Sequence, residues 1–88
     1  MFPFSIASLR DKVWKDMADK AGGKKHQGWS VYTVSRDGSL AYTSGYPNRF
    51  PIPGKIVEYW VSPNQLDRDT VLSGLIDACE RSGRIATY

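Results

Sequence analysis

The chain has 88 residues, which is enough for one small domain but too few for a two-domain enzyme, a TIM barrel or a complete dinucleotide-binding fold. Its charged fraction of 24% and hydrophobic fraction of 41% are typical of a globular protein rather than a disordered or membrane-embedded one. The net charge is +3, and residues 1–44 hold the whole excess, with seven basic and four acidic side chains against five of each in residues 45–88.

Apolar spacing predicts a first helix over about residues 6–21. Its apolar stripe consists of Ile6, Leu9, Val13 and Met17. Ser5, or Ser8 together with Asp11, is expected to cap the first turn, and Gly22-Gly23 is expected to end the helix.

Three strands are expected next. Alternating side chains predict them at residues 29–35, 40–44 and 55–61. Asp37-Gly38 predicts a tight turn between the first two, because glycine readily adopts the positive φ that such turns require. Residues 45–54 hold three prolines and two glycines, so they are expected to form a loop.

A second helix is predicted over roughly residues 64–82. Asn64 together with Asp67 is expected to cap it, and Gly83 to end it. Its apolar stripe consists of Leu72, Leu75, Ile76 and Cys79.

The predicted fold is therefore α+β, with the order α-β-β-β-α in one compact domain over residues 1–88. Three sequential strands with short links predict an antiparallel meander, and both helices are expected on one sheet face. In the third strand Val57, Tyr59 and Val61 suit the buried face, which leaves Ile56, Glu58 and Trp60 on the open face. The alternation does not decide which side of the hairpin is buried. The expected helical core consists of Leu9, Val13, Met17, Leu72, Leu75, Ile76 and Cys79.

No motif for catalysis or cofactor binding is present in the sequence. His26 is the single histidine, and the single cysteine, Cys79, falls at a core position. Asp67 and Asp69 are best explained as residues of a helix N-terminus. The sequence therefore predicts no enzyme activity, no metal and no cofactor.

The α-β-β-β-α order is similar to that of double-stranded-RNA-binding folds and of small ribonuclease toxins of the HicA type. In those toxins the catalytic histidine lies on the middle strand, whereas His26 precedes the first strand here. The RNA-binding folds begin their last helix with lysines, whereas this helix begins with Asp67-Arg68-Asp69. The likeness is one of topology, which does not imply function.

Three surfaces are candidate binding sites. The first is a basic set that would contact the phosphates of a nucleic acid, and its alternative interpretation is a solvated loop; its members are Lys20, Lys24, Lys25, His26 and Arg36. The second is the proline loop over residues 46–52, and the third is the open sheet face with Ile56 and Trp60. If the loop folds back over the open face, the two form one interface with Tyr46, Arg49 and Trp60 as candidate anchors and Phe50 as a further partner-binding residue. The alternatives for these two surfaces are that Phe50 folds over the core, that Trp60 packs against the loop or the N-terminus, or that the open face forms a homodimer.

The leading hypothesis is a small non-enzymatic protein that docks on a protein or nucleoprotein complex. Small chains of this kind are often phage or mobile-element inhibitors of a host complex, such as anti-CRISPR proteins. The alternatives are a basic nucleic-acid-binding module and, ranked lower, a ribonuclease toxin. With one unpaired cysteine, no signal peptide and no membrane helix in the sequence, the expected location is the cytoplasm.

Overall fold

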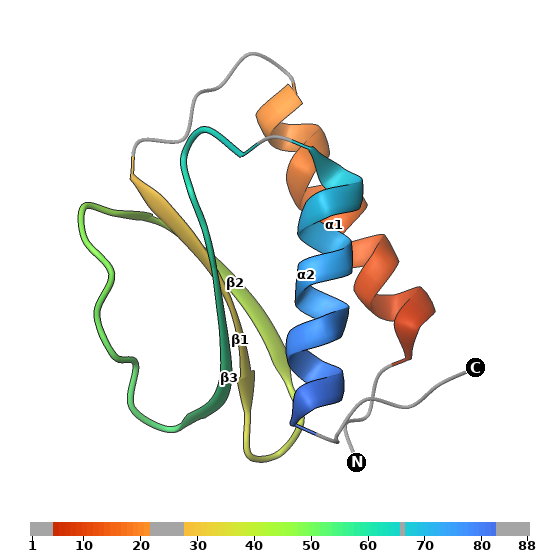
Figure 1. Ribbon diagram of the computed structural model, residues 1–88, viewed down its shortest axis with the longest axis vertical. Helices are drawn as coiled ribbons and strands as arrows, with labels where there is room; N and C mark the ends of the chain where they lie inside the picture. The colour runs from red at the N-terminus through yellow and green to blue at the C-terminus, as the bar shows by residue number, and fades with distance from the viewer. Residues whose placement is uncertain (1–4, 22–27, 66, 83–88) are drawn as a thin grey trace.

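The chain folds into two helices and a three-stranded antiparallel sheet (Figure 1). The computed structural model describes residues 5–21, 28–65 and 67–82, with the backbone alone at residues 20 and 21. In chain order, the elements are α1 (Ile6–Ala21), β1 (Trp29–Ser35), β2 (Leu40–Tyr46), β3 (Lys55–Val61) and α2 (Arg68–Arg81). These elements confirm the predicted α+β class and the predicted element order. Both helices lie on one face of the sheet, as expected (Figure 1).

The order of the strands in the sheet is β2-β1-β3, so the predicted meander is wrong. The hairpin of β1 and β2 forms as expected, although β2 continues to Tyr46, two residues into the segment predicted as loop, because Tyr46 pairs with Trp29. Strand β3 pairs with the other edge of β1. The physical reason is that β1 carries side chains suited to burial on both of its faces, and five of its seven residues are buried. Strand β2 contains Thr43, Ser44 and Gly45, which are all exposed, so it is better suited to an edge than to the centre.

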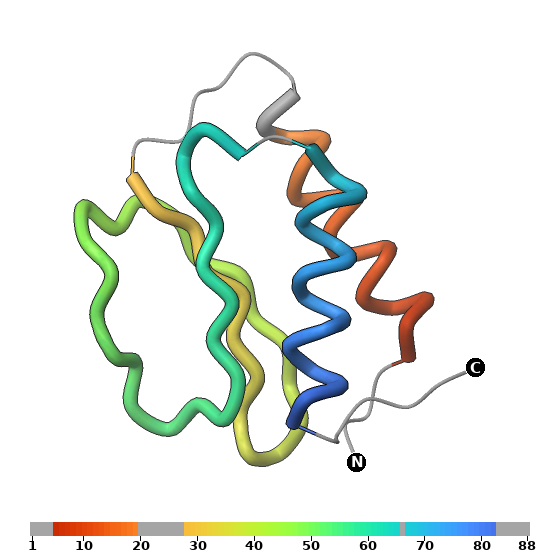
Figure 2. Tube along the Cα trace, viewed as in Figure 1, coloured from red at the N-terminus to blue at the C-terminus, as the bar shows by residue number. Residues whose placement is uncertain are grey.

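The proline loop makes this order possible because it crosses the full length of the sheet. Residues 47–54, eight in all, run from the end of β2 to the start of β3 on the side away from the helices (Figure 2). Eight extended residues reach about 26 Å, and a strand of seven residues is about 23 Å long. The loop must therefore be nearly extended, a conformation that Pro47, Pro51 and Pro53 favour. We call residues 47–54 the strap.

The main core lies between the helices and the sheet. Its buried members are Leu9, Val13, Met17, Tyr32, Val34, Val57, Val61, Val71, Leu72, Leu75 and Cys79. The helical core prediction is confirmed, except that Ile76 is only partly buried and that Val71 was not foreseen. Strand pairing shows which face of the hairpin packs against the helices. Tyr32 of β1 lies between Tyr42 of β2 and Tyr59 of β3, and all three belong to or pack against the helix-side core.

The ends of the elements follow the predicted chemistry with one correction. Ser5 caps α1, since its side chain accepts a hydrogen bond of 3.3 Å from the Ser8 N–H. Helix α2 begins at Arg68 rather than near Asn64, because the Asp67 side chain accepts from the Asp69 N–H at 3.2 Å and sets the first turn there. The turn glycine, Gly38, has a φ of 88°. The predicted end signals Gly22-Gly23 and Gly83 lie outside the described residues.

Candidate functional site

Aromatic side chains gather on the sheet face opposite the helices. The ring of Tyr46 lies 4.6 Å from that of Phe50 and 5.5 Å from that of Trp60, and the rings of Phe50 and Trp60 are 5.8 Å apart, all measured between centroids. All three pairs meet edge to face, an arrangement that aromatic quadrupoles favour. Together with Arg49 and Trp29, these residues form what we call the aromatic platform.

Arg49 lies between two indole rings of the platform. Its Cζ atom is 5.5 Å from the centroid of Trp29 and 5.9 Å from that of Trp60, which is the range of a cation–π contact. The residue is exposed, and within residues 5–21, 28–65 and 67–82 it forms no ion pair. The rings therefore hold the guanidinium in place without neutralising its charge.

One carboxylate ties the strap to the platform. The Trp60 indole N–H donates to Glu58 Oε1 at 3.0 Å, and the backbone N–H of Ile52 donates to Glu58 Oε2 at 3.2 Å. Both oxygens of Glu58 thus accept from neutral donors, one on β3 and one on the strap. This explains how an exposed glutamate on the open face contributes to the order of the platform.

A bulge turns Tyr46 toward the platform. Trp29 pairs with Tyr46 but Ser30 pairs with Ser44, so Gly45 is an extra residue in β2. Gly45 has a φ of 95°, which favours glycine. By simple alternation Tyr46 would point to the helix face, as Tyr42 does; the bulge instead sends it to the open face. Across the pair, a Cβ at Gly28 would overlap the carbonyl group of Tyr46, so Gly28 permits this close approach.

The four predicted docking residues, Tyr46, Arg49, Phe50 and Trp60, are brought together by the fold. Phe50 remains 44% exposed, while Tyr46 and Trp60 are half-buried. Trp29 was missed, although its alternation with Val31 places it on the same face as Trp60. The strap covers this face, where Val31 is fully buried and Thr33 is 4% exposed. The expectation that Trp60 packs against the loop is therefore confirmed, since its ring contacts Phe50. Part of the aromatic surface nevertheless remains exposed.

The predicted basic set is not brought together within the described residues. Arg36 lies in the hairpin turn after β1, a full strand length from Gly28 at the other end. Lys24, Lys25 and His26 lie outside the described residues, and so does the side chain of Lys20. The structure thus separates Arg36 from the start of β1 and leaves the rest of this prediction untested.

Other chemistry-bearing groups do not form a site in the described part of the chain. No three His, Cys, Asp or Glu side chains there could hold a metal ion. Cys79 is fully buried, and burial raises the pKa of its thiol to about 11, so it is a poor nucleophile. Nor is any described helix long and apolar enough to cross a membrane.

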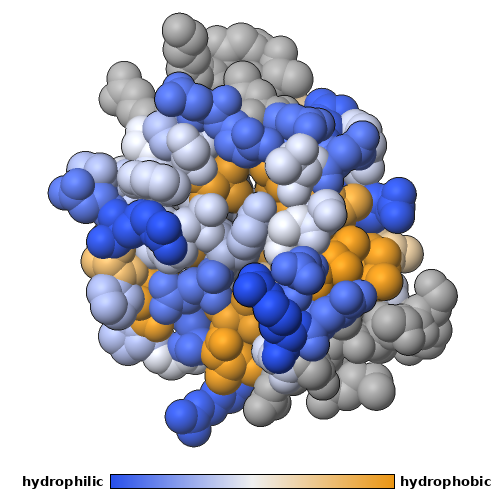
Figure 3. Space-filling model, in the orientation of Figure 1, coloured by the Kyte–Doolittle hydropathy of each residue, from blue (hydrophilic) through white to orange (hydrophobic). Residues whose placement is uncertain are grey.

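A shallow groove of about 420 Å³ runs between the helices. Its floor includes Leu72 and Ile76, and its rim carries Arg10 and acidic residues of α2. Apolar surface shows between the polar side chains on this side of the molecule (Figure 3). The groove contains none of the predicted docking or nucleic-acid-binding residues.

Lys12 and Asp16 of α1 form a half-buried polar pair. Asp16 of α1 has an Oδ2 atom that is buried without a hydrogen bond, 3.6 Å from Lys12 Nζ. Burial raises the pKa of this carboxyl, and Lys12 offsets part of the rise. The hydroxyl of Tyr32 is also buried without a hydrogen bond; burial, followed by the nearby Asp16 charge, raises its pKa.

Comparison with known proteins gives no family, because the chain matches no protein-family model, no curated protein and no solved structure.

Proposed function

We propose that this protein is a non-enzymatic binding module that docks on a protein or nucleoprotein partner through the aromatic platform. The observation that carries the proposal is the position of Arg49, held between Trp29 and Trp60 with no carboxylate partner among the described residues. Tyrosine, tryptophan and arginine are the side chains that most often dominate the free energy of binding at interfaces.

The platform is also pre-organised for binding. Its strap is held by the hydrogen bond from the Ile52 N–H to Glu58, which also accepts from the Trp60 indole, and three prolines restrict the backbone of the strap. A loop that is ordered before binding loses less conformational entropy when the complex forms. Phe50, at 44% exposure, would gain further burial against a partner.

The charge of the platform indicates the chemistry of the partner. Arg49 presents a planar guanidinium, which binds carboxylates with two parallel hydrogen bonds. Glu58, the acidic residue of β3, already accepts hydrogen bonds from Trp60 and Ile52. We therefore expect the partner to place a carboxylate against Arg49 and an apolar side chain against Phe50. Occlusion of a partner surface in this way is how the inhibitory role expected from the sequence would operate.

A nucleic-acid-binding function is the second candidate, and it rests on the same arginine. An exposed guanidinium beside aromatic rings also fits phosphate contact and base stacking. The two functions differ in their dependence on salt, because binding through phosphates weakens steeply as salt displaces the protein from the nucleic acid.

The test compares Arg49→Ala with a matched control, Arg81→Ala. Arg81 is equally cationic and highly exposed, but it lies at the end of α2 on the other side of the sheet. The proposal expects nuclease-treated lysate of the source cells to yield a protein that binds wild type and the Arg81 variant equally. Arg49→Ala should weaken that binding by about 2 kcal/mol, roughly thirtyfold in dissociation constant, with little change in the thermal midpoint.

Three outcomes would contradict protein docking. Equal loss of binding in both variants would show a general charge effect. Loss of the captured partner after nuclease treatment would favour the nucleic-acid function. If Trp60→Ala unfolds the chain and the remaining binding follows the folded fraction while Arg49→Ala binds normally, the platform is a second core and not an interface.

A further inference from the structure

Strand β2 forms an outer edge of the sheet, and its edge is unusual in carrying no charge. The sheet order β2-β1-β3 leaves β2 paired with β1 on one side only within the described residues. Its sequence, Leu-Ala-Tyr-Thr-Ser-Gly-Tyr, contains neither a charged residue nor a proline. Proteins commonly protect exposed edges with those residue types or with bulges, and the bulge at Gly45 interrupts only the last part of this strand.

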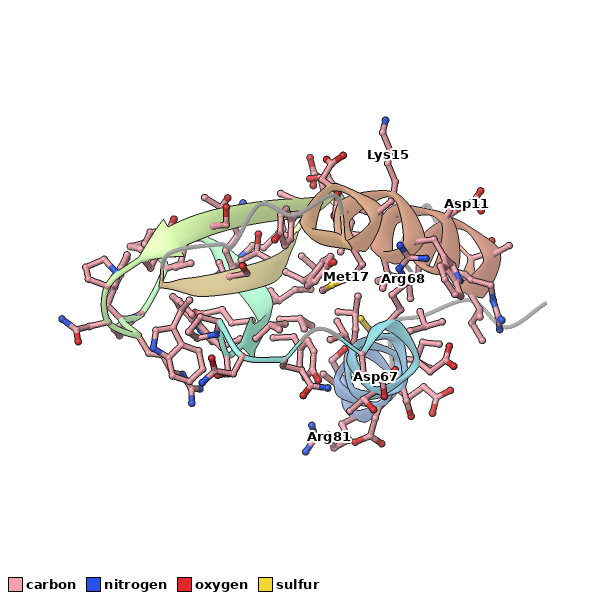
Figure 4. The ribbon with its side chains drawn as sticks, turned by 90° about the horizontal axis from the view of Figure 1, so that it is seen from above. Asp11, Lys15, Met17, Asp67, Arg68 and Arg81 are labelled. Atoms are coloured by element: carbon pink, nitrogen blue, oxygen red, sulfur yellow. The ribbon has the colours of Figure 1, made fainter. Side chains whose placement is uncertain are left out.

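The opposite edge provides the comparison. Strand β3 carries Lys55 and Glu58, and Glu58 accepts a hydrogen bond from the Ile52 N–H of the strap. In the view from above, the helices lie to one side of the sheet, and no described element lies beyond the β2 edge (Figure 4). Of the two outer strands in the described part of the sheet, β2 is therefore the one without a charged side chain.

We propose that β2 pairs with β2 of a second copy of this chain, antiparallel across a two-fold axis. Overlap centred on the middle residue of the strand, Thr43, pairs Tyr42 with Ser44 of the second copy and leaves the Gly45 bulge near the end of the overlap. Thr43 then faces Thr43 of the second copy, and Ala41 faces Gly45. These side chains are small, threonine pairs are favourable across strands, and no like charges meet.

Self-pairing suits this strand better than pairing with a different protein. An uncharged strand offers no charge pattern by which a foreign strand could be selected. It does satisfy the requirement of a two-fold interface, in which each side chain must be compatible with the same strand reversed. The pairing would join two sheets into one of six strands, with both aromatic platforms on the same face.

This inference is independent of the docking function, because the dimer needs neither Arg49 nor Phe50. If both proposals hold, the dimer presents two platforms side by side, and a partner with two sites would bind with increased avidity.

The first experiment measures the oligomeric state of the whole chain by sedimentation equilibrium at concentrations up to about 0.1 mM, which detects dissociation constants in the micromolar range. Wild type should dimerise. Thr43→Lys, which sets two lysines against each other across the axis, should raise the dissociation constant about tenfold or more. Thr43 is exposed, so the thermal midpoint of the monomer should change little, and Thr43→Val should still dimerise.

The second experiment uses disulfide formation to locate the axis. Residues that face each other across antiparallel strands have Cα atoms about 4.5–5.5 Å apart, within the range of disulfides. Thr43→Cys should therefore form a covalent dimer under mild oxidation, whereas the control Ser73→Cys, exposed on α2, should not. Cys79 is buried and should not compete. A wild type that stays monomeric, a Thr43→Lys variant that dimerises as well as wild type, or equal cross-linking at both positions would overturn the proposal.

Discussion

The two faces of the sheet are covered in different ways, although the central strand is buried on both. Toward the helices, Tyr32 and Val34 are fully buried beneath two amphipathic helices. Toward the strap, Val31 and Thr33 are almost as deeply buried beneath a single extended segment. The helices achieve this with two apolar stripes. The strap contributes one ring, Phe50, which contacts Tyr46 of β2 and Trp60 of β3, and one backbone N–H, which donates to Glu58 of β3.

The difference bears on how the two faces contribute to stability and to function. The helix face buries many aliphatic side chains, so its free energy is spread over many contacts and opening it requires global unfolding. The strap depends on few contacts at the surface, so it should open at lower free energy. A surface used for binding is more often found on the side with fewer constraints, which is where the aromatic platform lies.

The largest expected effect is on the helix face. Leu75 of α2 is fully buried in the core, so Leu75→Ala should lower the free energy of unfolding by about 2–4 kcal/mol. Chemical denaturation followed by circular dichroism would measure the change. Phe50→Ala, a larger truncation on the strap face, is the comparison and should cost less. If the Phe50 variant lost as much stability, the two faces would not differ in the way described.

The bulge that orients Tyr46 is the next most sensitive point. Gly45 has a φ of 95° and open space around its Cα, so Gly45→Ala meets backbone strain and no steric clash. We expect a cost of about 1 kcal/mol. The change in the near-ultraviolet circular dichroism of the aromatic cluster would show whether Tyr46 leaves the platform. Ser44→Ala, an exposed neighbour, is the control, and equal spectra for wild type and Gly45→Ala would contradict the role of the bulge.

The elements of the helix face could be predicted from the sequence because each depends on local periodicity. The stripe from Ile6 to Met17 gave α1 its observed bounds, and the alternation in β1 and β3 gave theirs. The start of α2 was placed too early because Asn64 and Asp67 are both good caps, and the choice between them depends on the tertiary position of the chain.

The strap face could not be predicted in the same way because it depends on the order of the strands. A short connection usually joins neighbouring strands, and that general tendency favoured a meander. The contrary signal was the length of residues 47–54, which is enough to cross β1, together with the apolar residues on both faces of β1. The docking residues were chosen by residue type, and their proximity became evident only with the crossing strap and the Gly45 bulge.

Removing one of the hydrogen bonds that Glu58 accepts should have a smaller and more local effect on stability. Glu58→Gln keeps the shape of the side chain but replaces one acceptor oxygen by an amide nitrogen, so one of the two hydrogen bonds is lost. The cost should be about 1 kcal/mol. Hydrogen exchange at the Ile52 amide should accelerate, while exchange in α2 stays unchanged. Glu80→Gln, an exposed glutamate of α2, is the control, and an unaltered Ile52 rate would show that the strap is held by its rings alone.

The smallest expected effect concerns the polar pair within the helix face, where Asp16 is the exception to an otherwise apolar cover. Burial raises the pKa of this carboxyl above its ordinary value of 3.8, so the folded state holds the proton more tightly than the unfolded state. As pH rises through the interval between the two pKa values, the free energy of unfolding therefore falls, and the full cost is present at neutral pH. Lys12, 3.6 Å from Asp16 Oδ2, keeps this cost small.

Asp16→Asn removes the buried charge and keeps the shape of the side chain, so it should raise the thermal midpoint at neutral pH. The gain should shrink as the pH falls toward 3.8, where wild type becomes protonated as well. Thermal melts of both proteins across this interval measure the difference, and Asp11→Asn, exposed on the same helix, corrects for the change in net charge. Lys12→Gln should have the opposite sign, because it leaves the Asp16 carboxylate without its counter-charge. A gain in thermal midpoint that stays constant with pH would show that the Asp16 carboxylate is solvated in the folded state. Burial of its charge would then not destabilise the helix face.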